Sequence, residues 1–198
     1  MSNAESEIAA RINRWAFDRD QQSWEALLDA FHDDGVISLS WFDGPYAGFV
    51  AASQRMAAVG RALVKHRLGV PAIRVRGGRA LSEVDVAILV RAQSPFGEID
   101  TTTHARFFDW LERRTGVWRL LRRTAIYEKD QVAPVCRPSL PAEFFAGLER
   151  FPAEVRFLAA SLERAGAALV KGLVLDGSPA ARDAYREGEA WLAAAGER

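Results

Sequence analysis

Apolar residues recur along the first part of the chain with the period of a helix. Between residues 5 and 31 they lie three, four or seven positions apart: Ile8, Ile12, Trp15, Ala16, Trp24, Leu27, Leu28 and Phe31. A polar patch at residues 18–23 interrupts the pattern, which predicts two helices joined at a bend. Gly35 is expected to cap the second helix, and residues 36–41 are rich in the residues that favour strands.

The period changes from helical to strand-like after a second helical stretch. Residues 50–65 are amphipathic and predict a helix. Four strand-like segments follow, at residues 67–76, 79–92, 99–113 and 117–129, and they are separated by Gly77-Gly78, Ser94-Pro95-Phe96-Gly97 and Arg114-Thr115-Gly116. These short connections suit antiparallel hairpins. Helices followed by a meander predict an α+β fold, with the helices laid on one face of a curved sheet.

A proline-rich stretch divides the main domain, predicted at residues 5–133, from a helical tail. Prolines recur in the predicted linker at residues 134–141. The tail, residues 142–198, is rich in Ala, Leu, Glu and Arg, and predicts helices from about Ala153 to Leu169 and from the N-cap Ser178 to Ala195. A further helical spacing joins Phe144, Phe145, Leu148 and Phe151. Such an amphipathic tail must pack on the main domain or on another subunit.

Composition narrows the possible partners and location. The 26 Lys and Arg residues balance the 26 Asp and Glu residues, so neither nucleic acid nor an acidic membrane surface is an expected partner. No apolar run approaches the roughly 20 residues that cross a bilayer, and the first residues lack the pattern of a signal peptide. The single cysteine, Cys136, argues against a disulfide framework and favours a cytoplasmic protein.

No cofactor or metal is expected from the sequence. The three histidines do not stand at metal-ligand spacing from one another. The pair Gly77-Gly78 suits a hairpin turn and does not form a phosphate-binding loop.

Three stretches resemble the SnoaL-like branch of the nuclear-transport-factor-2-like superfamily. They are the segment that begins Asp20-Gln21-Gln22-Ser23-Trp24 and ends Phe31-His32-Asp33-Asp34, the segment that begins His66-Arg67-Leu68-Gly69, and the hairpin around Arg114-Thr115-Gly116-Val117-Trp118. Together they lie within residues 12–130. Relatives include polyketide cyclases, scytalone dehydratase, hexachlorocyclohexane dehydrochlorinase and the β subunits of ring-hydroxylating dioxygenases. The resemblance implies a cone-shaped α+β barrel whose curved antiparallel sheet wraps around the N-terminal helices.

The resemblance also implies a histidine–aspartate dyad. Dehydratases and dehydrochlorinases of this fold use a histidine as a general base and an aspartate that orients it, which places His66 and Asp20 in these roles. Histidine suits the task because its ordinary pKa is near neutrality, and a buried carboxylate partner is expected to raise its basicity. Asp18 is the alternative partner, but Asp20 has the family's spacing of four residues before Trp24.

Other polar residues have two interpretations each. Strand alternation places Arg123 with Leu121, Ala125 and Tyr127, so Arg123 is either an anion-stabilising group inside the cone or an ordinary surface arginine. His104 is either a second pocket histidine, as in scytalone dehydratase, or half of a cross-strand polar pair. His32 is expected to face solvent.

The expected ligand is small and hydrophobic. Trp41, Tyr46 and Phe49 follow the first predicted strand and are candidates for the wall of an apolar pocket, together with Tyr127. The first functional hypothesis is a cofactor-independent lyase or isomerase that removes a proton from a small, cyclic compound. The second is a non-catalytic ligand-binding or assembly module that resembles the dioxygenase β subunits. A roomy or a filled cone would discriminate between them, and relatives suggest a homo-oligomer, either a dimer or a trimer.

Overall fold

The computed structural model describes residues 2–59, 62–136 and 138–196. Its α-helices are α1 (Asn3–Gln21), α2 (Trp24–Leu28), α3 (Tyr46–Val59), α4 (Arg156–Arg164) and α5 (Pro179–Ala193). Its strands are β1 (Phe31–Ser38), β2 (Asp43–Pro45), β3 (Ala62–Leu68), β4 (Ala72–Arg76), β5 (Arg79–Ser94), β6 (Gly97–Arg114), β7 (Val117–Pro134) and β8 (Val174–Leu175). Short 3-10 turns occupy Ala142–Phe145, Leu148–Arg150, Ala153–Val155 and Ala194–Gly196.

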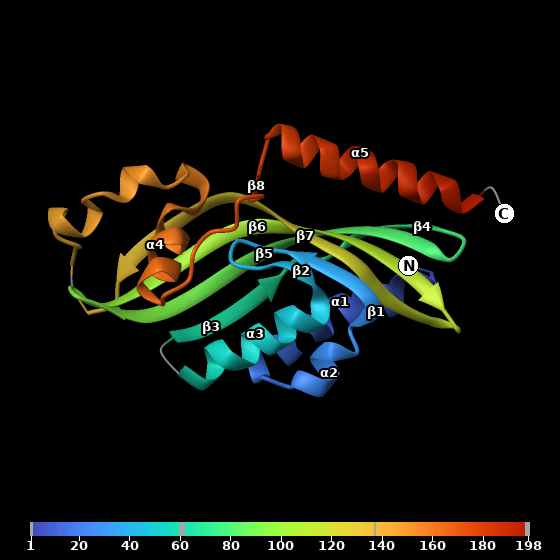
Figure 1. Cartoon of the computed structure of the whole chain (residues 1–198), viewed down its shortest axis with the longest axis horizontal. Helices are drawn as coiled ribbons and strands as arrows, with labels where there is room; N and C mark the ends of the chain where they lie inside the picture. Colours follow the sequence, from blue (N-terminus) through green and yellow to red (C-terminus); the bar gives the residue numbers. More distant parts are fainter. Residues whose placement is uncertain (1, 60–61, 137, 197–198) are drawn as a thin grey trace.

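The strands form one curved, open sheet with helices on both faces (Figure 1). Its order is β2-β1-β7-β6-β5-β3, with β4 also paired to β5 and β8 to β7. The long strands β5, β6 and β7 make the predicted antiparallel meander, whereas β1 joins the edge of β7 in parallel. The predicted α+β fold with a curved sheet on N-terminal helices is therefore confirmed.

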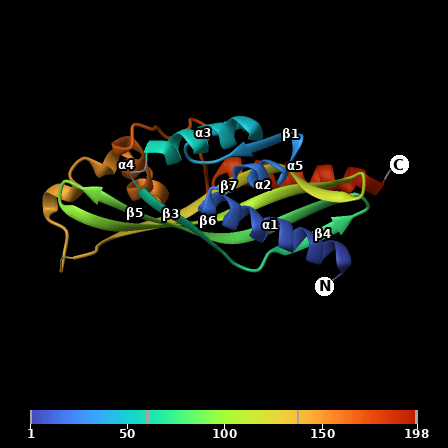
Figure 2. The ribbon, with the colours of Figure 1, turned by 90° about the horizontal axis from the view of Figure 1, so that it is seen from below.

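Helix α1 covers the concave face of the sheet (Figure 2). Ser2 and Glu5 form a capping box at its start, and Ile8, Ile12 and Trp15 are almost completely buried against the strands. Gln22 takes a left-handed conformation, with φ of 60°, and ends the helix. The predicted bend within the polar patch is thus a true helix end, followed by the single short turn of α2.

The expected cap at Gly35 is wrong, because β1 already begins at Phe31. The register of β1 against β7 shifts between Phe31 and Val36, and Gly35 lies in this irregular part of the strand. A Cβ at Gly35 would come within 2.8 Å of the carbonyl oxygen of His32, so the glycine serves the close backbone approach. His32 is also not solvent-facing as expected: its ring Nε2 lies 2.9 Å from the carbonyl oxygen of Glu112, and the residue is buried.

The predicted helix at residues 50–65 ends early, and strand β3 takes its last part. Residues 60 and 61 lie outside the described residues, as do Arg137 of the predicted linker and residues 197 and 198 of the tail. Strand β3 pairs antiparallel with β5, for example His66 with Ile88. Alternation explains the difference, because Leu63 is exposed while Val64 and His66 face a cavity. The single strand expected at residues 67–76 is accordingly divided between β3 and β4.

Helix α5 packs on the convex face of the sheet, opposite α1 (Figure 1). Ser178 caps its N-terminus as predicted, since its side chain accepts a hydrogen bond from the Ala181 N–H at 3.1 Å. The ring of Trp191 stacks on that of Trp110 with centroids 4.9 Å apart. The tail thus packs on its own chain with a small aromatic cluster.

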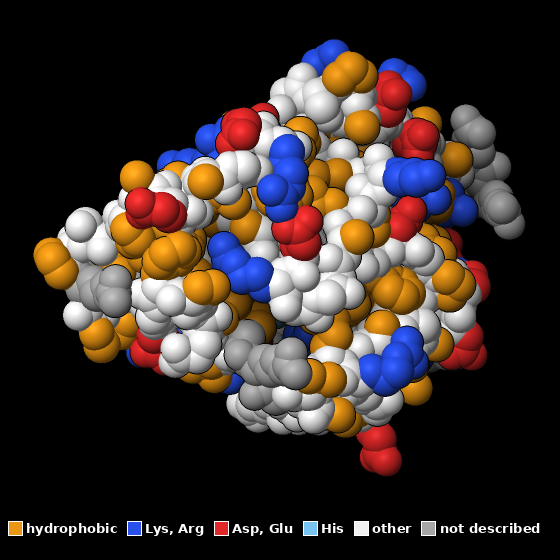
Figure 3. All heavy atoms as spheres, turned by 60° about the vertical axis from the view of Figure 1, so that its left-hand side comes forward, with side chains coloured by type: hydrophobic (Ala, Val, Ile, Leu, Met, Phe, Trp, Pro, Cys, Tyr) orange, Lys and Arg blue, Asp and Glu red, His pale blue; other side chains and the backbone are white. Residues whose placement is uncertain are grey.

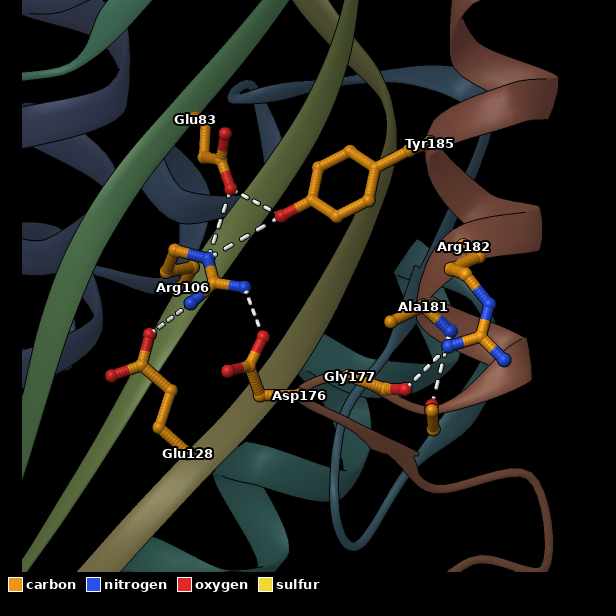
Figure 4. Close-up of polar contacts among 9 residues, drawn as sticks. Glu83, Arg106, Glu128, Asp176, Gly177, Ala181, Arg182 and Tyr185 are labelled. Carbon is orange, nitrogen blue, oxygen red and sulfur yellow. Dashed lines mark hydrogen bonds and ion pairs between the residues drawn. The ribbon is translucent and has the colours of Figure 1, made fainter.

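A charged cluster holds the segment before α5 against the sheet (Figure 4). The guanidinium of Arg106 is its centre: Nε lies 2.9 Å from Glu83 and Nη2 lies 2.6 Å from Asp176. Nη1 pairs with Glu128, and the hydroxyl of Tyr185 donates to Glu83. This cluster links β5, β6 and β7 to the tail on the face away from α1.

The rest of the tail is less helical than its sequence pattern predicted. The stretch around Phe144 and Leu148 forms 3-10 turns, and the predicted helix from Ala153 to Leu169 is reduced to a turn and α4. Hydrophobic side chains reach the surface on the side of the molecule where α4 lies (Figure 3). Cys136 is exposed, and no helix within the described ranges is long and apolar enough to cross a membrane.

Candidate active site

Asp20 and His66 face each other where the end of α1 meets β3. The His66 ring Nδ1 lies 2.7 Å from Oδ1 of Asp20, and the backbone N–H of His66 donates to Oδ2 at 2.9 Å. Lys65 adds a hydrogen bond from its ammonium to the backbone carbonyl of Asp20 at 3.0 Å. Both carboxylate oxygens are therefore used to fix the position of His66 and the strand that carries it.

This contact determines the tautomer of His66. An ionised carboxylate can only accept, so Nδ1 carries the proton and Nε2 keeps its lone pair. The side chains of His66 and Asp20 are only 10% and 7% exposed. Asp18, the alternative partner, turns the other way and pairs with Arg14 one helical turn earlier, at 2.8 Å.

Burial lowers the pKa of His66 below its ordinary value. The hydrogen bond and charge of Asp20 act in the opposite direction, and the guanidinium groups of Arg19 and Arg123 lower the pKa further. Asp20 thus raises the pKa of His66 as expected, but desolvation is the larger effect and the pKa stays below its ordinary value. The lowered pKa favours the neutral imidazole.

His66 forms part of the wall of a partly open, mainly apolar cavity of about 130 Å³. An apolar protein cavity of about 150 Å³ holds one benzene molecule, so this space fits a single six-membered ring. Aromatic side chains make much of the lining: Trp15, Trp41, Phe49, Phe107 and Tyr127. The edge of the His66 ring meets the Trp15 ring, with centroids 5.7 Å apart.

The tail closes one side of the cavity through α4. Leu158, Ser161 and Leu162 line the cavity from this helix. Asp130, near the end of β7, caps the helix by accepting the backbone N–H groups of Phe157 and Leu158 at 2.7 and 2.8 Å. The cavity is thus shared between the main sheet and the tail.

Comparison with known proteins agrees with this architecture. The model of the SnoaL-like domain family matches residues 1–124. The chain belongs to the SnoaL-like domain family. Pea pathogenicity protein 2 of Fusarium vanettenii is a relative that is 30% identical over 150 residues, which are 73% of this chain. The match spans 63% of that relative's own length.

Solved structures share the fold of this SnoaL-like chain. A type 2 hexachlorocyclohexane dehydrochlorinase, LinA, superposes with a TM-score of 0.60 at 13% identity, over 70% of this chain and 95% of that one. A candidate scytalone dehydratase of Novosphingobium aromaticivorans gives a TM-score of 0.56 at 16% identity, over 69% and 91% of the two chains. At such low identities the likeness establishes the fold alone.

The predicted ligand-binding residues of this SnoaL-like chain separate into two groups. Trp41, Phe49 and Tyr127 line the cavity. Tyr46 does not: its hydroxyl is buried beneath the cavity, where it accepts from Trp15 Nε1 at 3.0 Å and donates to the carbonyl of Leu27 at 2.7 Å. Tyr46 therefore supports the wall of the cavity without being part of it.

His104 lies on the opposite face of the sheet from His66. Along β6 the residues that point inward are Thr103, Ala105 and Phe107, so His104 points outward. It lines a separate surface depression with Gly69 and does not belong to the cavity. The expectation of a second pocket histidine is wrong for this reason.

Arg123 points inward as strand alternation predicted, but it lies beneath the cavity and not in its wall. Its Nε and Nη2 each lie 2.7 Å from an oxygen of Asp109, and both side chains are fully buried. The guanidinium also packs within 4.3 Å of the Trp15 ring centroid and 4.2 Å of that of Phe107. Arg123 is therefore neither a surface arginine nor a group in contact with the cavity.

The sequence pattern missed several residues that line the cavity, and Arg19 is the most polar of them. Arg19 immediately precedes Asp20, within the patch that was interpreted only as a bend. Trp15 is another cavity residue, and it lies four residues before Arg19 on the same face of α1. Within the described ranges, no three His, Cys, Asp or Glu side chains are grouped to hold a metal ion.

Proposed function

We propose that this chain is a lyase or isomerase that removes a proton from carbon in a small, single-ring substrate. His66 is the general base and Asp20 the residue that orients it. The observation that carries the proposal is the 2.7 Å contact of Asp20 with His66, which lines a mainly apolar cavity. The low pKa of His66 agrees with the role, because a base must be unprotonated before it acts.

The chemistry requires only groups that the cavity offers. Nε2 of His66 takes the proton, and the electron pair of the broken C–H bond moves into the substrate. A leaving group on the neighbouring carbon then departs with its electrons, which is a lyase reaction, or the proton returns at another carbon, which is an isomerisation. The Asp20 carboxylate stabilises the imidazolium that forms between these steps.

The apolar lining favours this type of reaction. Leu158 and Leu162 of α4 cover one side of the cavity, and the low exposure of His66 and Asp20 reduces the screening of the charge that acts on the imidazolium. The hydroxyl of Tyr127 accepts the backbone N–H of Ser40 at 2.9 Å, which leaves its own proton for a substrate oxygen. The cavity therefore combines one base with at least one hydrogen-bond donor.

The test is enzyme-dependent exchange of substrate hydrogen in D2O, followed by proton NMR. The panel consists of single-ring compounds with an acidic C–H beside a carbonyl, such as phenylacetone and phenylpyruvate. We expect His66→Asn to lose the exchange, by a factor of about 10²–10⁴, as is usual for a general base. His104→Asn is the matched control, because this histidine lies on the other face of the sheet. Equal losses in the two variants would contradict the proposal.

The second candidate function is a non-catalytic module that encloses a ligand. Closure of the cavity by Leu158 and Leu162 of the tail favours it. In that case compounds of the panel would bind to both the wild type and His66→Asn, and neither protein would exchange hydrogen. Chromatography with light scattering would test the proposed dimer or trimer alongside.

A further inference from the structure

Arg19 brings a positive charge into the wall of the cavity. It belongs to the last turn of α1 and lines the same space as His66. Its guanidinium carbon lies 5.9 Å from the ring centroid of Trp24 and 5.9 Å from that of Phe49. The side chain is half-buried beside these aromatic rings, and one of them, Phe49, also lines the ring-sized space.

No carboxylate among the described residues pairs with this guanidinium. The ion pairs and side-chain hydrogen bonds of residues 2–59, 62–136 and 138–196 include none from Arg19. The adjacent Asp20 is directed to His66, and the nearby Asp18 is taken by Arg14. Burial lowers the pKa of Arg19 and outweighs the charge of the adjacent Asp20, which acts in the opposite direction.

A guanidinium without a paired carboxylate beside an apolar cavity favours an anionic ligand. A buried charge is costly unless it is paired, and a neutral carbonyl compensates it far less than a carboxylate does. A carboxylate can accept two parallel N–H bonds from one guanidinium. The cavity of about 130 Å³ at the same time limits the apolar part of the ligand to about one ring.

We propose that Arg19 is the anion-recognition residue of this cavity and that the substrate is a single-ring organic acid. Its carboxylate pairs with Arg19 while its ring lies against Trp15 and Phe107 beside His66. The assignment of a substrate, as distinct from a ligand, rests on the proposed function. A larger substituent has room in the adjoining surface groove, which shares Trp41 and Met56 with the cavity.

Binding of such an acid also affects the base. The charge of Arg19 lowers the pKa of His66, so a carboxylate that neutralises Arg19 raises that pKa again. His66 would thus become a stronger base once the substrate is bound. A role of Arg19 in structure alone would not produce this coupling.

The experiment compares calorimetric binding of benzoate and of its neutral analogue benzamide. In the wild type we expect benzoate to bind more tightly. In Arg19→Gln, benzoate should lose about 10- to 100-fold in affinity, the range of a charge-assisted hydrogen bond, while benzamide stays within about twofold. Arg19→Lys should retain part of the preference. Arg67→Gln is the matched control, since Arg67 Nη1 lies 4.0 Å from Oδ2 of Asp20 and Arg67 does not line the cavity.

Three results would overturn the proposal: no binding of benzoate to the wild type, equal affinities for the two ligands, or equal losses of both in Arg19→Gln. Circular dichroism checks that the variants fold, and an NMR titration of His66 should show its pKa rising in Arg19→Gln even without ligand. His66→Asn should still bind benzoate. A protein that prefers benzoate but exchanges no hydrogen would therefore contradict the proposed reaction and leave anion recognition intact.

Discussion

Replacing Asp109 by leucine removes the partner of the buried cation Arg123. The two side chains are fully buried and joined by two hydrogen bonds of 2.7 Å, and the two residues are directly paired across β6 and β7. Removing one partner of a buried ion pair costs about 3–5 kcal/mol, because the remaining charge keeps its desolvation penalty. Nη1 of Arg123 already has no hydrogen-bond partner among the described residues, so the structure offers no substitute acceptor.

This magnitude translates into a large change in thermal stability. For chains of 150–250 residues, 1 kcal/mol shifts the melting temperature by roughly 2–4 °C, so Asp109→Leu should lower it by about 6–20 °C. The double variant Asp109→Leu/Arg123→Met removes both charges and keeps apolar groups between Trp15 and Phe107. It should recover most of the loss, since replacing a whole buried pair by apolar residues is often neutral or stabilising.

Urea unfolding of the wild type, both single variants and the double variant gives the free energies for a double-mutant cycle. The coupling energy isolates the pair from the packing of each side chain. A loss below about 1 kcal/mol in Asp109→Leu would refute the reasoning, because the remaining cation would then be well solvated. A double variant no more stable than Asp109→Leu would refute it as well, since packing and not charge would then explain the loss.

Three further predictions follow from other contacts. Asp20→Asn should lower the pKa of His66 further, because the carboxylate raises it against the effect of burial; an NMR titration that shows no change would contradict this. Burial raises the pKa of Asp130 from 3.8 to about 6. Between roughly pH 4 and 6 the folded protein therefore keeps a proton on Asp130 that the unfolded chain releases. The free energy of unfolding should fall as pH rises through this window. In Asp130→Asn the free energy of unfolding, measured in urea, should no longer fall with pH in this window. An unchanged pH dependence would show that other groups cause it. Gly188→Ala should destabilise the protein by about 1–3 kcal/mol through overpacking, since its Cβ would lie 2.6 Å from the Phe108 ring; unchanged thermal unfolding would show that α5 adjusts freely.

The sequence predicted best those elements whose signals are local. The hairpins of β5, β6 and β7 have turn residues at short connections and long alternating flanks, so their limits were close to those observed. The boundary between α3 and β3 was placed wrongly, because the apolar residues 62–64 fit either a helical or a strand period over so short a distance. The early start of β1 depends on its pairing with β7. Because β7 is far away in the sequence, no local pattern indicates this pairing.

Part of the candidate site could be predicted from the sequence. The pairing of Asp20 with His66 came from a family motif and not from periodicity, and the two side chains do lie together. The cavity wall that α4 supplies could not be predicted, because it depends on how the tail docks. The face of the sheet on which His104 lies could have been predicted. Phe107 is an odd number of residues away on the same strand, so the two side chains point to opposite faces.

Arg19 shows why a site's charge balance becomes visible only in three dimensions. In the sequence it stands between two aspartates, Asp18 and Asp20, and looks like one member of a charged, solvated patch. Helix geometry turns successive side chains by about 100°, so the three neighbours point in different directions. Asp18 meets Arg14, Asp20 meets His66, and Arg19 is left facing the cavity. Two aspartates next to Arg19 in the sequence thus leave its guanidinium without an ion pair beside an apolar space, and the carboxylate of the proposed ligand would supply the missing partner.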